Sequence, residues 1–162
     1  DNYEQVMSEQ TAYQVTTILE GVIQRGTGKK LRDLQLNLAG KTGTTNENTD
    51  AWFIGFTSNL VIGVYVGMDN PKPLGKFETG SKAALPIFKE FIEKSVKKSD
   101  ARPFKVPKKM TLMVIDPLTG EKAKFNSKNT IIEAYKSKNV LSGKVLYSNN
   151  NRLDINNILK FY

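Results

Sequence analysis

Hydrophobic positions recur at helical spacing in two stretches of the chain. Ser8 is a favourable N-cap residue followed by an acidic residue, so a helix is predicted to begin there. The Gly26-Thr27-Gly28 triplet predicts its end. Its apolar positions are Ala12, Val15, Ile18, Leu19, Val22 and Ile23. A second helix, with Pro86 allowed only in its first turn, has an apolar face made of Ala84, Leu85, Phe88, Phe91, Ile92 and Val96.

Apolar and β-branched runs between these two stretches predict strands. Residues 35–41 are expected to form one strand. Residues 51–57 and 60–68 form two further runs with only two polar residues between them, which predicts an antiparallel hairpin. Glycines inside these strands indicate a close approach by another backbone or helix. Trp52 is expected to support the core rather than to contact a ligand.

The C-terminal third of the chain has a different character. Residues 99–109 are basic and contain Pro, so they are a candidate linker between residues 1–98 and a small basic extension at residues 110–162. A short strand is predicted at Met110 to Ile115, followed by a turn at Asp116 to Gly120. The Lys- and Asn-rich remainder predicts a small appended hairpin and a mobile tail.

Composition narrows the function classes. A chain of 162 residues is one domain, or one and a part. The net charge of +8 comes from dispersed Lys with only four Arg, which favours a solvated basic face over attraction to a membrane or wall polymer, and does not indicate nucleic-acid binding. The absence of Cys and His excludes disulfides, thiolate metal sites, His-based triads and ordinary zinc sites. No metal and no cofactor is expected. No apolar run is long enough to span a membrane. Because the first residue is Asp rather than Met, we expect the chain to be part of a longer protein.

The block Leu-Ala-Gly-Lys-Thr-Gly-Thr-Thr-Asn at residues 38–46 carries the candidate chemistry. A phosphate-binding loop would need Gly in place of Gln35 and a helix directly after Thr42. Gly43 and a polar loop follow instead, so a nucleotide site is rejected. Lys-Thr-Gly alone would be interpreted as a polar turn after an edge strand, and the sequence around it argues against that interpretation.

Several further motifs surround this block in a fixed order and spacing. They are Gln24-Arg25-Gly26-Thr27-Gly28, Asp50-Ala51-Trp52-Phe53-Ile54-Gly55-Phe56, Gly63-Val64-Tyr65-Val66-Gly67-Met68-Asp69, Pro71-Lys72-Pro73-Leu74-Gly75, Glu78-Thr79-Gly80 and Ala84-Leu85-Pro86-Ile87-Phe88. Together with Lys-Thr-Gly, the third signature of the penicillin-recognising serine acyltransferases, they closely resemble the C-terminal half of the transpeptidase domain of class A penicillin-binding proteins. The resemblance runs from about Ser8 to Phe91, and more loosely to about Thr119.

This resemblance implies an α+β fold, an antiparallel sheet flanked by helices, with a small appended C-terminal β segment and tail. It implies a Ser nucleophile that attacks the D-Ala-D-Ala carbonyl of a peptidoglycan stem peptide, forms an acyl-enzyme and is acylated by β-lactams. The implied partners are the stem peptide, β-lactams and the remainder of the transpeptidase domain, with no nucleic acid. The implied location is the periplasmic face of the bacterial inner membrane, anchored by a segment outside this chain.

The resemblance also assigns roles along the signature. Lys41 and Thr44 are expected to be catalytic, with the Thr44 N–H as one oxyanion donor. Thr42, Gly43, Thr44 and Thr45 are expected to bind substrate, with the two hydroxyls of Thr42 and Thr44 on its terminal carboxylate. Because strand residues alternate faces, Lys41 and Gly43 should share one side of the strand, and Thr42 and Thr44 the other.

The other two family signatures, Ser-x-x-Lys and Ser-x-Asn, should precede Lys41, but Thr11 stands where the first would need Lys after Ser8. Later matches are rejected because they come in the wrong order: Ser95-Val96-Lys97-Lys98, Ser127-Lys128-Asn129, Ser137-Lys138-Asn139 and Ser148-Asn149-Asn150. The isolated chain is therefore expected to be inactive. The alternatives left open are a fragment of a D,D-carboxypeptidase or serine β-lactamase, and a non-catalytic basic module that binds wall polymer or a membrane surface.

Overall fold

The structure is a computed structural model, and it describes residues 4–137 and 147–148. The chain divides into two compact units, residues 16–105 and residues 1–15 with 106–162. The first helix, α1 (Glu9–Arg25), contributes residues to both units. It begins as predicted, because the Thr11 N–H donates to Ser8 Oγ at 3.3 Å, and it ends before the Gly-Thr-Gly triplet. The domain boundaries predicted from the sequence stay predictions.

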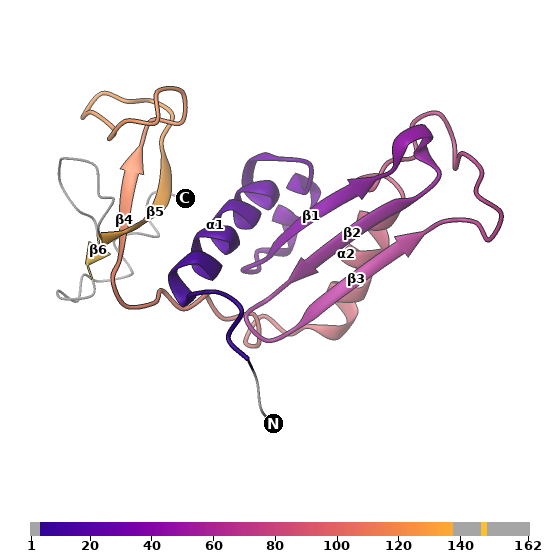
Figure 1. Cartoon of the computed structure of the whole chain (residues 1–162), viewed down its shortest axis with the longest axis horizontal. Helices are drawn as coiled ribbons and strands as arrows, with labels where there is room; N and C mark the ends of the chain where they lie inside the picture. Colours follow the sequence, from indigo (N-terminus) through magenta and orange to yellow (C-terminus); the bar gives the residue numbers. More distant parts are fainter. Residues whose placement is uncertain (1–3, 138–146, 149–162) are drawn as a thin grey trace. The chain divides into compact units, whose positions relative to one another are not determined.

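The unit at residues 16–105 contains an antiparallel sheet (Figure 1). Its strands are β1 (Ala39–Thr44), β2 (Ala51–Phe56) and β3 (Val61–Val66), in that order across the sheet. The predicted hairpin is confirmed, since β2 and β3 pair from Ala51 opposite Val66 to Phe56 opposite Val61. The signature strand β1 has β2 as its neighbour and stands at the end of the strand order.

The predicted strand at residues 35–41 is wrong at its N-terminal end. A 3₁₀ helix, η1 (Lys29–Leu34), occupies the preceding residues and ends at Gln35, whose φ of 53° is left-handed. The Gln35 N–H bonds the Arg32 carbonyl, which completes the last turn of η1 rather than a ladder. The strand therefore begins at Ala39 and runs on to Thr44, so that it contains the signature instead of leading into it.

A second helix, α2 (Ala84–Ser95), covers one face of this sheet (Figure 1). Pro86 lies in its first turn, where the missing N–H costs no helical bond. Phe88 of α2 meets Phe53 of β2 edge to face at 4.7 Å between ring centroids, and both are fully buried. Burying one such ring stabilises the fold by about 1.5–3 kcal/mol. The surrounding core consists of Ile23, Leu31, Leu38, Phe53, Ala84, Leu85, Phe88 and Ile92.

Gly55 explains how closely α2 approaches the sheet. A Cβ added at Gly55 would lie 2.6 Å from Phe88 Cζ and 2.8 Å from Phe53 Cε1. No side chain fits between these two rings and the strand, so the close approach predicted for a strand glycine is confirmed at this position.

The opposite face of the sheet, here called the outer sheet face, is apolar and exposed. Its main members are Trp52, Ile54, Val61 and Tyr65, which are 41%, 49%, 71% and 49% exposed. The Trp52 and Tyr65 rings lie 4.7 Å apart. The expectation that Trp52 supports the core is therefore wrong. Alternation along β2 turns Ala51 and Phe53 towards α2 and Trp52 to the other side, and nothing in the local sequence indicates which face would be covered.

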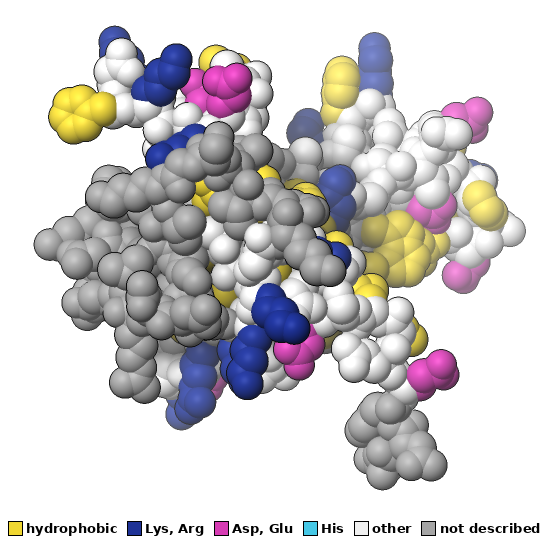
Figure 2. Space-filling view, turned by 60° about the vertical axis from the view of Figure 1, so that its left-hand side comes forward, with side chains coloured by type: hydrophobic (Ala, Val, Ile, Leu, Met, Phe, Trp, Pro, Cys, Tyr) yellow, Lys and Arg dark blue, Asp and Glu magenta, His cyan; other side chains and the backbone are white. Residues whose placement is uncertain are grey.

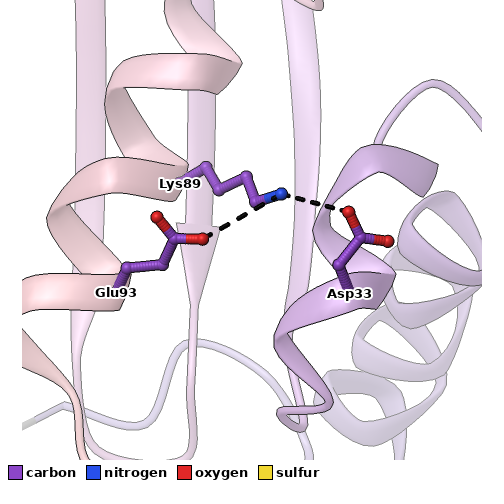
Figure 3. Close-up of polar contacts among 3 residues, drawn as sticks. All are labelled: Asp33, Lys89 and Glu93. Carbon is purple, nitrogen blue, oxygen red and sulfur yellow. Dashed lines mark hydrogen bonds and ion pairs between the residues drawn. The ribbon is translucent and has the colours of Figure 1, made fainter.

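Lys89 makes two ion pairs at the surface, one between α2 and η1 and one within α2 (Figure 3). Lys89 Nζ lies 3.1 Å from Asp33 Oδ2 and 4.0 Å from Glu93 Oε1, one turn further along α2. The three side chains are partly or largely exposed, so each pair contributes on the order of 0.2–1 kcal/mol. Only the pair with Asp33 links the two helices, so the pairs contribute little to the stability of the fold.

The other unit contains a second antiparallel sheet, in the order β5-β4-β6. Its strands are β4 (Met110–Ile115), β5 (Ile131–Lys136) and β6 (Tyr147–Ser148). The predicted strand and appended hairpin are confirmed. Within this unit, two side chains from the start of α1 bond the C-terminal segment, since Gln10 donates to the Lys108 carbonyl and Gln14 to the Ala134 carbonyl. The tail predicted to be mobile lies largely outside the described residues.

Candidate active site

The hydrogen-bonding pattern between β1 and β2 determines which backbone N–H and C=O groups of the signature do not bond β2. The Thr45 N–H donates to the Asp50 carbonyl at 3.1 Å, so this pair continues the ladder beyond β1. Backbone groups of successive strand residues point to opposite edges, so Lys41 and Gly43 bond β2, and Thr42 and Thr44 turn their N–H and C=O away from it. An independent contact agrees, because the Thr42 carbonyl accepts from Lys41 Nζ at 2.8 Å. The backbone groups of Thr42 and Thr44 therefore face the open edge of β1.

The Lys41 ammonium group lies at this edge, beside the next residue of the strand. Its Nζ lies 3.3 Å from Thr42 Oγ1, in addition to its bond to the Thr42 carbonyl. Lys41 stands opposite Ile54, whereas Thr42 stands opposite Phe53. The expected alternation of faces is therefore present in the register, yet the length of the Lys side chain brings its charge to the hydroxyl of its neighbour.

Each of the two signature hydroxyls has a partner from outside the strand. Thr42 Oγ1 lies 2.9 Å from Thr27 Oγ1, in the segment between α1 and η1. Thr44 Oγ1 accepts from the Gly80 N–H at 3.0 Å. Thr44 is exposed and Gly80 is buried. Both hydroxyls are thus oriented by contacts made before any ligand arrives.

Gly80 lies in close contact with the backbone of the signature strand. A Cβ added there would come within 2.3 Å of the Trp52 carbonyl oxygen and 2.5 Å of the Gly43 carbonyl oxygen. These are backbone atoms of a paired ladder, which cannot move aside cheaply. The loop that precedes α2 can therefore approach β1 and β2 this closely only because residue 80 is Gly.

Thr45 belongs to the turn between β1 and β2, which includes the short 3₁₀ segment η2 (Asn46–Asn48). Its Oγ1 accepts from the Asp50 N–H at 2.9 Å and lies 2.8 Å from Thr49 Oγ1. Tyr65 Oη donates to Asp50 Oδ1 at 2.7 Å, and this bond lowers the pKa of Asp50 and raises that of Tyr65. In this structure the Thr45 hydroxyl closes the turn, and its contact with substrate stays a prediction.

The fold brings together Lys41, Thr42, Gly43 and Thr44 along one strand edge, and places Thr45 just beyond them. Thr27 and Gly80 were missed as members of this site. They stand 15 and 36 residues from their partners, Thr42 and Thr44, so no spacing rule joins them. The available signal was their position in the Gly-Thr-Gly and Glu-Thr-Gly triplets, which belong to the motifs that carry the family resemblance.

The rejected Ser95 match stands at the last residue of α2 and is exposed. Lys98, which would complete that match, donates from Nζ to Gln35 Oε1 at 3.2 Å. A Ser at the C-terminal end of a helix has no helix N-terminus near it to stabilise developing negative charge. The C-terminal end of α2 thus does not supply the positive helix-dipole field that would favour a nucleophile at Ser95.

Three further properties concern metal binding, membrane spanning and surface charge. Within the described ranges, no cluster of three or more His, Cys, Asp or Glu residues is arranged to hold a metal ion. Of the helices in those ranges, none is both long and apolar enough to cross a membrane. On the described part of the face in Figure 2, the Lys and Arg side chains are scattered, with acidic side chains among them.

Comparison with known proteins places this fold and this strand in a family. A family model described as the penicillin-binding protein transpeptidase domain matches residues 2–93, which is more than half of the chain. The chain belongs to this family. The class inferred from the signature and its surrounding motifs is confirmed.

The chain is similar to proteins called penicillin-binding protein 1A. It is 47% identical over 135 residues to that of Rickettsia prowazekii, which covers 83% of this chain and 17% of the relative. It is 38% identical over 135 residues to that of Pseudomonas aeruginosa, covering 83% of this chain and 16% of the relative. A crystal structure of penicillin-binding protein 1A from Haemophilus influenzae superposes with a TM-score of 0.68 at 27% identity, over 85% of this chain and 22% of that one.

These comparisons confirm the α+β fold, an antiparallel sheet flanked by helices. The chain spans less than a fifth of the length of the two curated relatives.

Proposed function

We propose that the chain is the C-terminal part of a peptidoglycan D,D-transpeptidase, and that β1 forms one wall of its active site. The observation that carries this proposal is the open edge of β1. Thr42 and Thr44 present their backbone groups there, and Lys41 places its ammonium group beside them. An open strand edge can bind an extended peptide through main-chain hydrogen bonds.

The proposed reaction is acyl transfer. A serine supplied by another part of the protein attacks the carbonyl of the D-Ala-D-Ala bond, and the terminal D-Ala leaves as its amine. An amine of a neighbouring stem peptide then attacks the acyl-enzyme and forms the cross-link. β-Lactams acylate the same serine, because their strained amide occupies the position of the scissile bond.

Thr44 is proposed to act twice. Its N–H, directed to the open edge, donates to the oxyanion of the tetrahedral intermediate, where one donor is worth about 2.7–4 kcal/mol. Its hydroxyl already accepts from the Gly80 N–H, so its own proton remains available to donate to the terminal carboxylate of the substrate. Gly43 keeps the strand surface beside these groups free of a side chain, so that substrate can lie against it.

Lys41 is proposed to supply positive charge and to support proton transfer. Its ammonium has three protons, and two of them are directed to the Thr42 carbonyl and hydroxyl oxygens. The third proton can bond a group on the side of the cleft where the nucleophile lies. Thr42 and Thr45 are the proposed further contacts to substrate.

A D,D-carboxypeptidase or serine β-lactamase would use the same strand, with water in place of the acceptor amine. A non-catalytic basic module is the alternative from another class. The description of the matching family model favours the transpeptidase, and the intact Lys-Thr-Gly-Thr block disfavours a module without chemistry. The proposed location is the periplasmic face of the inner membrane, held there by a segment outside this chain.

Intact-mass spectrometry after incubation with benzylpenicillin tests the proposal. The longer protein that contains this chain should gain one penicillin, and the isolated chain should gain none. Lys41→Ala in the longer protein should slow acylation at least ten-fold, because it removes the charge and a proton-transfer partner. Lys89→Ala, which removes a surface ion pair, is the matched control and should acylate normally. An unlabelled longer protein would refute the proposed activity, and a labelled isolated chain would refute the expected inactivity of the chain.

A further inference from the structure

Thr27 stands at the signature strand, although it comes from a different part of the chain. Its Oγ1 lies 2.9 Å from Thr42 Oγ1, which also lies 3.3 Å from Lys41 Nζ. We infer that Thr27 and Thr42 act as one hydroxyl pair that binds the terminal carboxylate of the substrate, and that Thr27 determines specificity for anionic substrates. This inference rests on the proposed function and adds a residue to that site.

The end of α1 fixes where Thr27 lies. The N–H groups of both flanking glycines, Gly26 and Gly28, donate to the Val22 carbonyl, at 3.0 and 3.1 Å. A Cβ added at Gly28 would lie 2.7 Å from Ile23 Cδ1 in the core. The residues on both sides of Thr27 are therefore anchored to the helix, and Thr27 between them is exposed. A hydroxyl on such a rigid segment loses little further conformational entropy when a ligand binds.

Counting protons shows what the pair can offer a ligand. Two hydroxyls joined by one hydrogen bond use one of their two protons and keep the other. If Thr27 donates, Thr42 Oγ1 accepts from both Thr27 and Lys41, and the Thr42 proton remains. If Thr42 donates, the Thr27 proton remains. In both arrangements the pair keeps one O–H donor beside the ammonium group. A bound carboxylate can also replace the bond between the hydroxyls, so that Thr27 and Thr42 each donate to it, and Thr27→Val then removes one of two charge-assisted bonds.

A carboxylate is the ligand that suits this arrangement. It accepts hydrogen bonds and cannot donate them, and its charge strengthens bonds from hydroxyls next to an ammonium group. Thr44 supplies a second O–H at the same strand edge, two residues further along β1. A neutral ester or amide at the same position would gain much less, because the charge-assisted part of each bond would be lost.

A purely structural role is the alternative explanation, in which the Thr27–Thr42 bond only ties the end of α1 to β1. The two explanations differ in how the effect of the substitution depends on ligand charge. A structural tie affects every ligand alike, because it moves the whole strand. A carboxylate contact affects only ligands that carry the carboxylate.

The experiment compares benzylpenicillin with its neutral methyl ester as acylating agents of the longer protein. Thr27→Val removes the hydroxyl with little change in shape, Thr27→Ser keeps it, and Thr130→Val is the control at another exposed Thr. We expect Thr27→Val to lower the second-order acylation rate by roughly ten-fold with benzylpenicillin and by less than about two-fold with the ester. Thr27→Ser and Thr130→Val should stay near the wild-type rate with both.

Three results would overturn the inference. An equal loss with both agents would make Thr27 a structural tie, and an unchanged rate with benzylpenicillin would remove it from the site. A Thr27→Ser variant as slow as Thr27→Val would show that the hydroxyl is not the active group. A wild-type protein that benzylpenicillin does not acylate at all would instead overturn the proposed function, and this inference with it.

Discussion

Thr44 offers the sharpest test of how the signature strand works, because its hydroxyl has two separable tasks. Within the fold it accepts the Gly80 N–H at 3.0 Å. Towards substrate it is proposed to donate to a carboxylate. Thr44→Ser preserves both tasks, Thr44→Ala removes both and leaves space for water, and Thr44→Val removes both and fills the space with a methyl group. The three variants keep the backbone N–H proposed for the oxyanion.

The two losses are separated by different assays. Loss of one hydrogen bond to a charged group costs about 1.5–3 kcal/mol, which is roughly ten- to a hundred-fold in acylation rate for both Ala and Val. Loss of the acceptor for the buried Gly80 N–H costs about 1–3 kcal/mol of stability where water cannot replace it. Because Thr44 is exposed, water can replace the hydroxyl in the Ala variant but not behind the Val methyl. Thr44→Val should therefore be the less stable of the two, at an equal acylation rate.

The measurements are the second-order rate of penicillin acylation and the thermal midpoint of the longer protein. The Ser variant should match wild type in both. Wild-type acylation by Thr44→Val would refute the role of the hydroxyl in the cleft. A Ser variant as slow as Ala would show that the methyl group, rather than the hydroxyl, matters. Equal thermal midpoints for Ala and Val would refute the structural role of the Gly80 bond.

Three further predictions concern stability and association of the chain itself. Burial raises the pKa of Glu20 from 4.5 to about 7, so between these pH values the folded chain holds a proton that the unfolded chain has lost. The free energy of unfolding should therefore fall by up to about 3 kcal/mol as pH rises from about 4.5 to about 7. Urea unfolding at pH 5 and pH 8 measures this fall, which should be weaker in Glu20→Gln. Gly55→Ala forces a methyl group against Phe88 and should cost about 1–3 kcal/mol by thermal melting, whereas Gly63→Ala, whose added Cβ lies 4.0 Å from the nearest side chain, should be close to neutral. The exposed outer sheet face should make the isolated chain self-associate as its concentration rises, and Ile54→Lys should reduce this in light scattering; a monodisperse wild-type monomer would contradict that expectation.

Local patterns in the sequence determined most elements of the fold. The helix at Ser8 and the hairpin at residues 51–68 were predictable because capping, periodicity and strand composition act over a few residues. The strand at the signature was predicted to begin four residues before its actual start at Ala39, because the 3₁₀ helix at residues 29–34 has no comparably strong local pattern. The family followed from the order and spacing of several motifs rather than from Lys-Thr-Gly alone.

Only the tertiary structure decided what surrounds the signature. The sequence placed Thr42 and Thr44 on one strand, but the ladder phase that turns their backbone groups to the open edge depends on the pairing with β2. Thr27 and Gly80 reach the two hydroxyls across 15 and 36 residues of chain, and Trp52 lies on the exposed face because α2 packs on the other. Contacts between distant segments depend on how helices and strands pack, and no local propensity encodes that packing.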